Sequence, residues 1–391
     1  MKARSRFKLR KEPVLEWSLL RFGEGNSKNE ERTLASDAQR PCQARYAIFL
    51  ALRELGLEPG DEVLAPSYVC AAAVNPILAY GCQPAFYPIT AQCEIHLSQL
   101  ESKIHSRTRA VLAVHYFGFP DPNLQQLRDL CNRRNLLLIE DCAHVLWGEW
   151  RGILLGKIGD ASVFSYRKFL PIPDGAGLRL SRSGVPAATR VRREPYRQTL
   201  KHAINLAEGR WPRLSDILRP SKPATVEVTE EDASSGRLSH EGDFDPLQLD
   251  RGTSRVSQWV LKHTQIEEVV RCRRRNYLEL SARLQNIPGA QLLFPELPAG
   301  VCPWTLPLRI DGQPLAHRAL RRMGIPAVAW DAMRPPELEV PKFPDAGFLY
   351  DNLFFLPVHQ SLAPHDIDAM VAAVAQVGAC TPKREAVCSV G

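Results

Sequence analysis

The sequence predicts an α/β fold in which helices cover both faces of a mostly parallel sheet. Two observations carry this prediction. From about Arg45 onwards, short apolar runs alternate with amphipathic segments, and their spacing suits strands joined by helical crossovers. Such alternation is typical of parallel sheets with helices on both faces. A chain of 391 residues also exceeds the size at which one core stops growing, so we expect a second, smaller domain.

The predicted elements follow one another along the first half of the chain. YAIFLALRELGL is expected to form a helix ending near Gly56, PGDEVLAPSY a turn and a strand, AAAVNPILAYG a helix and QPAFYPI a strand. HLSQLESKI, RAVLAVHYFG, NLQQLRDLCNRRN and LLLIEDCAH continue as helix, strand, helix and strand. Active sites in such sheets lie beyond the carboxyl ends of the strands. Three apolar runs stop at Ser67, His115 and Asp141, so these residues are expected to share one cleft.

The second half predicts a long loop followed by a smaller domain. The polar, Pro- and Gly-containing stretch at about 219–247 is expected to be an exposed loop. SQWVLKHTQIEEVVRCRRRNYLELSARLQ is expected to be one long helix, and WTLPLRI, LAHRALRRMG, NLFFLPVH and HDIDAMVAAVAQVG are the elements of the small domain. The predicted organisation is an N-terminal arm at 1–40, a large domain at 41–255, a small C-terminal α+β domain at 256–380 and a tail at 381–391.

Composition and charge exclude several classes of protein. The net charge of +7 comes largely from the opening MKARSRFKLRK and from RCRRRNY at 271–277, which we interpret as solvated faces because no nucleic-acid-binding module accompanies them. Ten cysteines occur without a CxxC pair, so no metal site or disulfide framework is predicted, and most should be reduced and buried. No stretch approaches the ~20 apolar residues that cross a bilayer. We therefore expect a cytoplasmic protein without a membrane partner.

The motifs that carry chemistry are IEDCAH at 139–144 and FSYRKFLPIPDGAG at 164–177. With PGDEVLAPSY, VHYFG and FLPVHQSL in the same order, they make the chain resemble the DegT/DnrJ/EryC1/StrS family, which are fold-type I, pyridoxal-phosphate (PLP) dependent aminotransferases acting on nucleotide sugars. The resemblance runs from about Gln43 to Gln376. It implies the fold-type I architecture, PLP as cofactor and a homodimer whose sites lie at the subunit interface.

The resemblance assigns the catalytic roles to Lys168 and Asp141. Lys168 would bind PLP covalently through its amine and move the proton at the donor's α-carbon, whereas the alternative is a surface lysine at a strand end. Asp141 would bond the protonated pyridine nitrogen, and the alternative is an N-cap. His144 stands where many relatives have a glutamine near the cofactor's phenolic oxygen, although a packed core histidine is an equally simple interpretation.

The cofactor phosphate is expected at the start of the helix that follows Gln43, because unpaired N–H groups and the helix dipole favour an anion there. Relatives have a Ser-Gly pair at this point, whereas this chain has Gln43 and Ala44, followed by Arg45, which can donate charge-assisted bonds. Ser165, three residues before the lysine, is a second candidate phosphate ligand.

Further positions depart from the family pattern or carry two interpretations. Where relatives often stack an aromatic ring on the cofactor, this chain has Cys70, with Tyr68 as a substitute. Relatives usually contact the phosphate across the subunit interface with an asparagine that shortly precedes an arginine. The corresponding run here, GTSRVS, has Thr253 and Arg255. His115 is placed near cofactor or substrate by the resemblance, or satisfies a buried carbonyl instead. Gly118, Gly175 and Gly177 are expected to serve turns.

The leading functional hypothesis is transamination of a keto group on a nucleotide-linked sugar, with glutamate as amino donor, in the synthesis of a polysaccharide or glycosylated metabolite. Lys168 argues against the dehydratase branch, which has histidine at this position. The alternatives are a homologue that keeps the fold for binding or regulation, and another PLP reaction such as elimination. For sulfur transfer, Cys142 is a poor nucleophile because it lies beside the cofactor aspartate.

Overall fold

A six-stranded sheet forms the larger part of the molecule. The computed structural model describes residues 9–20, 39–181 and 244–379. The strand order is β2-β1-β3-β4-β7-β8, and every neighbouring pair is parallel except β7 and β8. The strands are β1 (Glu62–Pro66), β2 (Gln83–Tyr87), β3 (Thr108–Val114), β4 (Leu137–Cys142), β7 (Ala161–Ser165) and β8 (Ala176–Leu180). The predicted mostly parallel sheet is confirmed.

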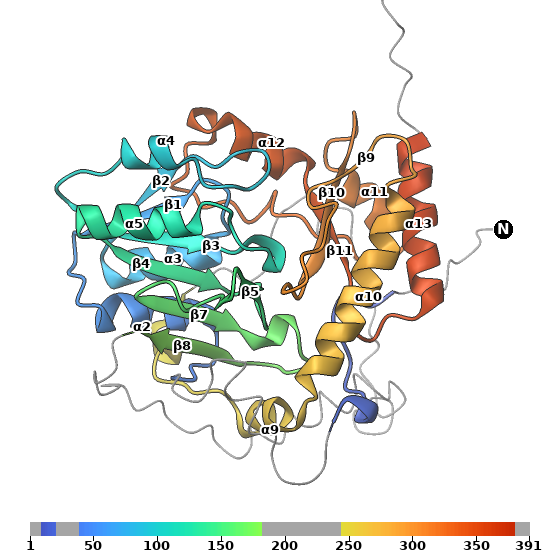
Figure 1. The fold of residues 1–391 in the computed structure, drawn as a ribbon, viewed down its shortest axis with the longest axis horizontal. Helices are drawn as coiled ribbons and strands as arrows, with labels where there is room; N and C mark the ends of the chain where they lie inside the picture. The colour runs from blue at the N-terminus through green and yellow to red at the C-terminus, as the bar shows by residue number, and fades with distance from the viewer. Residues whose placement is uncertain (1–8, 21–38, 182–243, 380–391) are drawn as a thin grey trace, which may run out of the picture.

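Helices cover both faces of this sheet (Figure 1). Helices α2 (Ala44–Glu54) and α3 (Ala71–Tyr80) pack against each other on one face, and α4 (Leu97–Glu101) and α5 (Leu124–Arg134) lie on the other. The strands between them are buried on both sides; β1, for example, is buried along its whole length. This double burial explains why the strands appear in the sequence as continuous apolar runs.

A three-stranded antiparallel sheet, ordered β11-β10-β9, forms the C-terminal part with its helices. Helices α10 and α13 lie side by side at the edge of the molecule farthest from β2 (Figure 1). The elements are α9 (Arg255–His263), α10 (Ile266–Leu284), β9 (Ala290–Leu292), β10 (Thr305–Ile310), α11 (Ala316–Arg322), α12 (Pro344–Asn352), β11 (Phe354–Pro357) and α13 (Pro364–Ala379), and β5 (Glu149–Trp150) pairs with β6 (Ile153–Leu154) in a small ribbon.

The predicted single helix from Ser257 to Gln285 is wrong, because the structure breaks it between α9 and α10. Thr264 is extended, with ψ at 134°, and its hydroxyl donates to the carbonyl of Val260. The N-terminal segment occupies the break: Leu20 bridges Thr264, and the amide of Gln265 donates to Leu19. A partner about 245 residues away along the chain therefore overrides local helical propensity.

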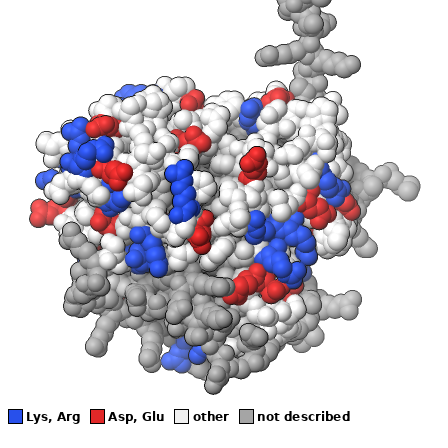
Figure 2. Space-filling model, in the orientation of Figure 1, with Lys and Arg blue, Asp and Glu red and all other residues white. Residues whose placement is uncertain are grey.

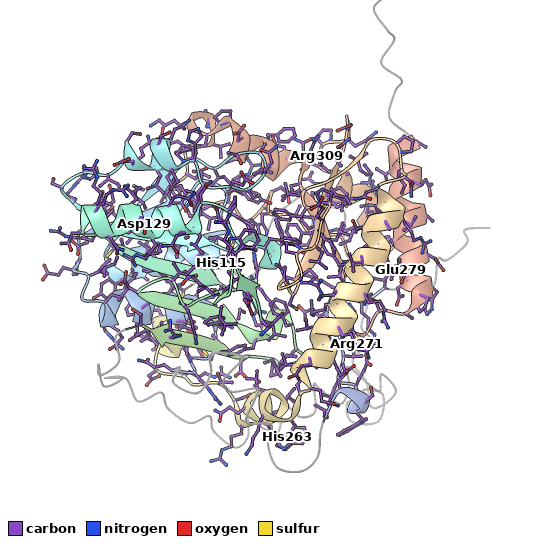
Figure 3. The ribbon with its side chains drawn as sticks, viewed as in Figure 1. His115, Asp129, His263, Arg271, Glu279 and Arg309 are labelled. Atoms are coloured by element: carbon purple, nitrogen blue, oxygen red, sulfur yellow. The ribbon has the colours of Figure 1, made fainter. Side chains whose placement is uncertain are left out.

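The interpretation of RCRRRNY as a solvated face is wrong for two of its arginines. Arg271 is exposed and pairs with Glu268 on the outer side of α10 (Figure 3), but Arg273 is only 1% exposed and Arg274 is half-buried. On the face drawn in Figure 2, basic and acidic side chains of the described residues lie interspersed. The described chain thus presents mixed charge on this face.

Several predictions fall partly outside the described residues. Of the expected loop at about 219–247, the part up to 243 lies outside them, and Pro246–Gln248 forms a short 3-10 helix with Leu247 86% exposed. The tail at 381–391 and much of the arm at 1–40 also lie outside them. The division into domains stays a prediction.

Among the cysteines that are described, six are buried and two are partly buried, all as free thiols. No described helix has the length and apolar character that crossing a bilayer demands.

Candidate active site

The carboxyl ends of two adjacent strands bring Asp141 and Lys168 together. β4 pairs with β7 in parallel, with Asp141 opposite Val163, so both strands end at the same edge of the sheet. Asp141 is the next-to-last residue of β4, and Lys168 ends the 3-10 helix Tyr166–Lys168 that follows β7 directly. This edge is where parallel sheets place their ligands.

Two adjoining cavities open at this edge. The smaller, of about 70 Å³, is lined by Gln43, Ala44, Arg45, Cys70, Asp141, His144, Ser165 and Lys168, among others. The larger, of about 380 Å³, shares Arg45, Cys70 and Lys168 with it and extends to side chains of the C-terminal part, including Trp304, Trp330 and Phe355. The structure therefore brings eight of the sequence-predicted positions to one site.

Asp141 is a buried carboxylate beside a cation. Its Oδ1 accepts a 2.9 Å hydrogen bond from the amide of Ala143. Burial raises the pKa of Asp141, and the charge of Lys168 and the Ala143 amide oppose that rise. The N-cap alternative is wrong, because residues 143–147 form turns and bends and β5, not a helix, is the next element. A buried carboxylate that faces a cavity needs a cationic partner.

Lys168 lies over an aromatic stack that the sequence did not predict. Its Nζ is 4.6 Å from the ring centroid of Trp304, a cation–π contact. The ring of His144 stacks on Trp304 at 4.1 Å between centroids. The amide of Phe117 donates to Nδ1 of His144, and burial, with the charges of Lys168 and His115, lowers the pKa of His144 well below its ordinary value. His144 is therefore neutral, with its proton on Nε2.

Arg273 fastens this loop to the C-terminal part. Its Nε donates to Gln360, its Nη1 to the carbonyl of Trp304 and its Nη2 to the carbonyl of Phe169. Burial lowers the pKa of Arg273 to about 10, so it stays a cation at neutral pH. The sequence did not single out Arg273, because it lies in a run of basic residues. A signal was present, since Arg273 is seven residues before Leu280 and therefore lies on the same buried face of α10.

The position expected for the cofactor phosphate carries hydrogen-bond donors and positive charge, which suit an anion. Helix α2 begins at Ala44, and Gln43 makes no side-chain cap, so the first amides of the helix face the smaller cavity uncapped. Arg45, only 7% exposed, lines both cavities. Ser165 is buried and lines the smaller one. These groups together offer amides, a guanidinium and a hydroxyl to one anion.

The prediction that Ser67 and His115 share the cleft with Asp141 is corrected by the structure. Both are buried, and neither lines either cavity. His115 lies deep in the molecule (Figure 3), where its Nε2 is 2.9 Å from Oε2 of Glu140. Glu140 also accepts from the amides of Gly156, Ile158 and Gly159. These four donors saturate its carboxylate, so the pair organises the sheet edge behind Asp141.

Tyr68 is not the aromatic ring of the cavities. It is fully buried and packs against Trp330 and Tyr350, with centroids at 4.9 and 4.8 Å. Cys70, the N-cap residue of α3, does line both cavities. The aromatic surfaces that reach the larger cavity are Trp304, Trp330 and Phe355, and no local sequence signal marks them as site residues.

Thr253 and Arg255 lie away from both cavities of this protomer. The Thr253 hydroxyl donates to the carbonyls of Arg40 and Pro41, and Arg255 begins α9 with an exposed side chain. Their cross-subunit role stays a prediction.

The expectation that Gly118 serves a turn has a steric reason. Its φ is +96°, and an added Cβ would lie 2.6 Å from the carbonyl oxygen of Cys302. The turn before the His144 stack thus requires glycine.

Part of the chain, including IEDCAH at 139–144 and FSYRKFLPIPDGAG at 164–177, is similar to known proteins. Residues 42–177 match the DegT/DnrJ/EryC1/StrS aminotransferase family. GDP-perosamine synthase of Vibrio cholerae is 36% identical over 159 residues, which are 37% of this chain and 43% of that protein. A putative L-glutamine:3-amino-2,3-dideoxy-scyllo-inosose aminotransferase from Micromonospora echinospora is 38% identical over 132 residues, 33% of this chain and 31% of that protein. The matched segment thus spans less than half the length of these curated relatives.

Solved structures resemble the chain over most of its length. The aminotransferase TlmJ from Streptoalloteichus hindustanus has a TM-score of 0.63 at 22% identity, covering 90% of this chain and 89% of TlmJ. The PLP form of a putative sugar aminotransferase from Streptococcus pneumoniae has a TM-score of 0.63 at 18% identity, with coverage of 90% and 89%. These likenesses confirm the predicted fold-type I architecture, and the family match supports the resemblance over residues 42–177.

Proposed function

Because residues 42–177 match the DegT/DnrJ/EryC1/StrS aminotransferase family, we propose that this protein is a PLP-dependent aminotransferase. It converts a keto group on a nucleotide-linked sugar to an amine, with glutamate as donor, in the synthesis of a polysaccharide or glycosylated metabolite. It acts in the cytoplasm as a homodimer. The observation that carries the proposal is the placement of Lys168 and Asp141 after the adjacent strands β7 and β4, on one cavity.

The residues of the smaller cavity fit PLP by their chemistry. An amine at Lys168 can bind an aldehyde, a buried carboxylate at Asp141 can hold a protonated pyridine nitrogen, and the start of α2 with Arg45 and Ser165 can hold a phosphate. Where the family's Ser-Gly pair is replaced by Gln43 and Ala44, the guanidinium of Arg45 supplies charge-assisted bonds instead, which are roughly twice as strong as neutral ones.

When bound, PLP supplies an electron-withdrawing ring that stabilises negative charge at the donor's α-carbon. The protein's part is proton transfer and positioning. Lys168 Nζ would move a proton between the donor's α-carbon and the cofactor, so its amine must reach both. Asp141 would hold the proton on the ring nitrogen, and the bond from the Ala143 amide fixes the orientation of its carboxylate.

The aromatic stack controls the surroundings of Lys168. Because His144 is neutral with Nε2 protonated, it can donate one hydrogen bond into the smaller cavity without adding charge. Trp304 covers one side of the Lys168 amine and keeps water from that side. Arg273 fixes both Trp304 and the loop after Lys168, so the amine and its aromatic neighbour keep their relative position.

The sulfur-transfer alternative is not favoured by the cysteines at the site. Burial raises the pKa of Cys142 well above its ordinary value, and burial also raises the pKa of Cys70, although the charge of Lys168 opposes that rise. Both thiols are therefore protonated at neutral pH, whereas sulfur transfer needs a thiolate. A purely regulatory homologue would also have no chemical need for both Lys168 and Asp141.

The proposal is tested by cofactor attachment and by the first half-reaction. Borohydride reduction of the PLP-loaded protein should label the peptide that contains Lys168, and excess glutamate without a sugar should release 2-oxoglutarate equal in amount to the enzyme while the absorbance of bound PLP shifts. Lys168→Ala should abolish both, whereas Lys157→Ala, which alters an exposed lysine, should abolish neither. A label on another lysine, or no reaction with glutamate, glutamine or alanine, contradicts the proposal.

A further inference from the structure

The larger cavity carries an excess of cationic side chains. It is lined by Lys11, Arg45, Arg167, Lys168, Arg273 and Arg334, against a single acidic residue, Glu12. We propose that two of these, Arg167 and Lys11, form a subsite that binds an anionic oxygen group of the substrate, a carboxylate or a phosphate. This inference rests on the proposed function, because it assigns the recognition of substrate at the same site.

The other cations are already engaged. All three donor nitrogens of Arg273 are hydrogen-bonded within the protein. Arg334 donates to the carbonyl of Asp331 and to the carboxylate of Asp351, and its guanidinium lies 5.3 Å from the centroid of the Tyr350 ring. The proposed function assigns Arg45 to the cofactor phosphate and Lys168 to the cofactor aldehyde. Arg167 and Lys11 remain.

Arg167 is placed to meet a group attached close to the reacting carbon. It precedes Lys168 in the 3-10 helix after β7 and lines both cavities. Its side chain is half-buried, and within the described part of the chain it makes no hydrogen bond or ion pair. A guanidinium held at a cavity wall with its donors unused is suited to an anionic oxygen, which it can bind in two-pronged geometry.

Lys11 reaches the same cavity from the opposite end of the sequence. The segment that carries it is held against the end of β11: Nε2 of His359 is 3.0 Å from the carbonyl oxygen of Arg10, and the amide of Val14 donates to Oγ of Ser361 at 3.1 Å. Pro13 is buried, whereas the Lys11 side chain is exposed and has no polar partner among the described residues. The backbone is thus fixed while the ammonium stays available at the cavity mouth.

The two cations differ in burial, and this gives the subsite a measurable signature. A charge at the exposed Lys11 is screened by salt, whereas the half-buried Arg167 is screened much less. Two sources can supply the anion. The carboxylates of the amino donor are one, and the diphosphate of a nucleotide-linked sugar is the other.

The test measures binding to the PLP-loaded protein by calorimetry, with two probes that cannot react. Glutarate, a dicarboxylate without an amine, represents the donor, and inorganic diphosphate represents the nucleotide sugar. Arg167→Gln should weaken at least one probe by about 10-fold or more, as expected when a charge-assisted hydrogen bond is lost. Lys11→Gln should weaken the same probe by roughly 3-fold at low salt and have no effect in about 0.5 M NaCl.

Matched controls separate a local contact from a change in overall charge. Arg133→Gln on the outer side of α5 and Lys157→Gln remove exposed cations away from both cavities and should leave the binding of both probes unchanged. The probe that loses affinity in Arg167→Gln identifies the source, carboxylate or diphosphate.

Three outcomes overturn the subsite. They are a wild-type protein that binds neither probe, an Arg167→Gln protein that binds both as tightly as wild type, and an Arg167→Gln protein whose only defect is loss of bound PLP. Failure of the proposed function is distinguishable from these. If wild type does not react with glutamate but the Arg167→Gln protein loses probe affinity, the subsite stands and the aminotransferase assignment falls.

Discussion

Two neighbouring carboxylates at the end of β4 have opposite surroundings. Glu140 is fully buried; burial disfavours its ionised form, but the hydrogen bond and charge of His115 and the amides of Gly159 and Gly156 hold its pKa below the ordinary value. Asp141 faces the cavity, accepts one bond, and has a pKa that burial raises. Glu140 therefore belongs to the architecture of the sheet edge, whereas Asp141 is free to take the chemical role that the proposed function gives it.

Conservative substitutions should separate these roles. Asp141→Asn keeps the shape but removes the charge that holds a ring nitrogen protonated, so turnover should fall at least ~100-fold, or about 2.7 kcal/mol, with the thermal midpoint nearly unchanged. Glu140→Gln turns two of its acceptor sites into donors facing backbone amides and should lower stability by roughly 2–4 kcal/mol. Kinetics and thermal denaturation of both variants check this. Near-wild-type turnover of Asp141→Asn would leave Asp141 with only the local structural bond to the Ala143 amide.

Single site residues could be predicted from the sequence only where they stand in a recognisable motif. Asp141 and Lys168 stand in recognisable local sequences at strand ends. Arg273 and Trp304 do not, because their importance comes from a contact between α10, the loop after Lys168 and the start of β10. Tyr68 was expected at the cavity as a substitute for the ring that relatives stack on the cofactor near the position of Cys70. Its side chain is instead fully buried in the core.

Most helices and strands were predictable because apolar runs on doubly covered strands are easy to recognise. The exceptions have tertiary causes. β7 is only five residues long and ends within the FSYRKFLPIPDGAG motif, and its pairing with β4 and β8 decides its structure. The break at Thr264 depends on Leu19 and Leu20, which no local pattern around Thr264 reveals. The same N-terminal segment also needs His359 to stay in place.

Acid should loosen this segment through His359. Burial lowers the pKa of His359 to about 4, opposed by its bond to Arg10 and reinforced by the charge of Arg273. Since the folded pKa lies below the unfolded value of about 6.5, stability is complete above pH ~6.5 and is lost as pH falls towards 4, by up to about 3 kcal/mol. Hydrogen exchange at the peptide containing Val14 should therefore accelerate between pH ~6.5 and ~4, after correction for intrinsic rates.

The control for this prediction keeps the hydrogen bond and removes the titration. His359→Gln can still donate to the carbonyl of Arg10, so its exchange should become nearly independent of pH. His96→Gln changes a histidine whose side chain contacts that of Ser98 and should behave as wild type. Besides Arg10 and Arg273, the charged group facing His359 is Asp366. Equal acid sensitivity in His359→Gln would assign the loosening to that carboxylate or to the fold as a whole.

Across the whole molecule, the catalytic pair and the cavity walls have different origins in the sequence. Asp141, Lys168 and the start of α2 lie within residues 42–177, the segment matched by the family. Lys11, Trp304, Trp330 and Arg334, which shape the larger cavity, lie outside it. The proposed reaction type therefore rests on motifs that are local in the sequence. The choice of substrate depends on side chains that only the folded chain assembles.

The proposed homodimer makes a prediction that distinguishes sites built by one chain from sites shared by two. Arg255 is exposed and lines neither cavity of its own protomer, so a role in phosphate binding requires it to act in the partner's site. Lys168→Ala and Arg255→Ala should each be strongly impaired alone. In a mixed dimer of the two, one site carries both defects and the other carries neither.

Unfolding and refolding the two variants together should therefore restore about a quarter of wild-type activity, because half of the dimers are mixed and half of their sites are intact. Activity is measured as 2-oxoglutarate released from glutamate, and each variant refolded alone is the control. If Arg255 acted within its own chain, every site in a mixed dimer would keep one defect and no activity would return. A fully active Arg255→Ala protein would remove Arg255 from the phosphate site altogether, leaving Arg45, Ser165 and the start of α2 to hold that anion within one protomer.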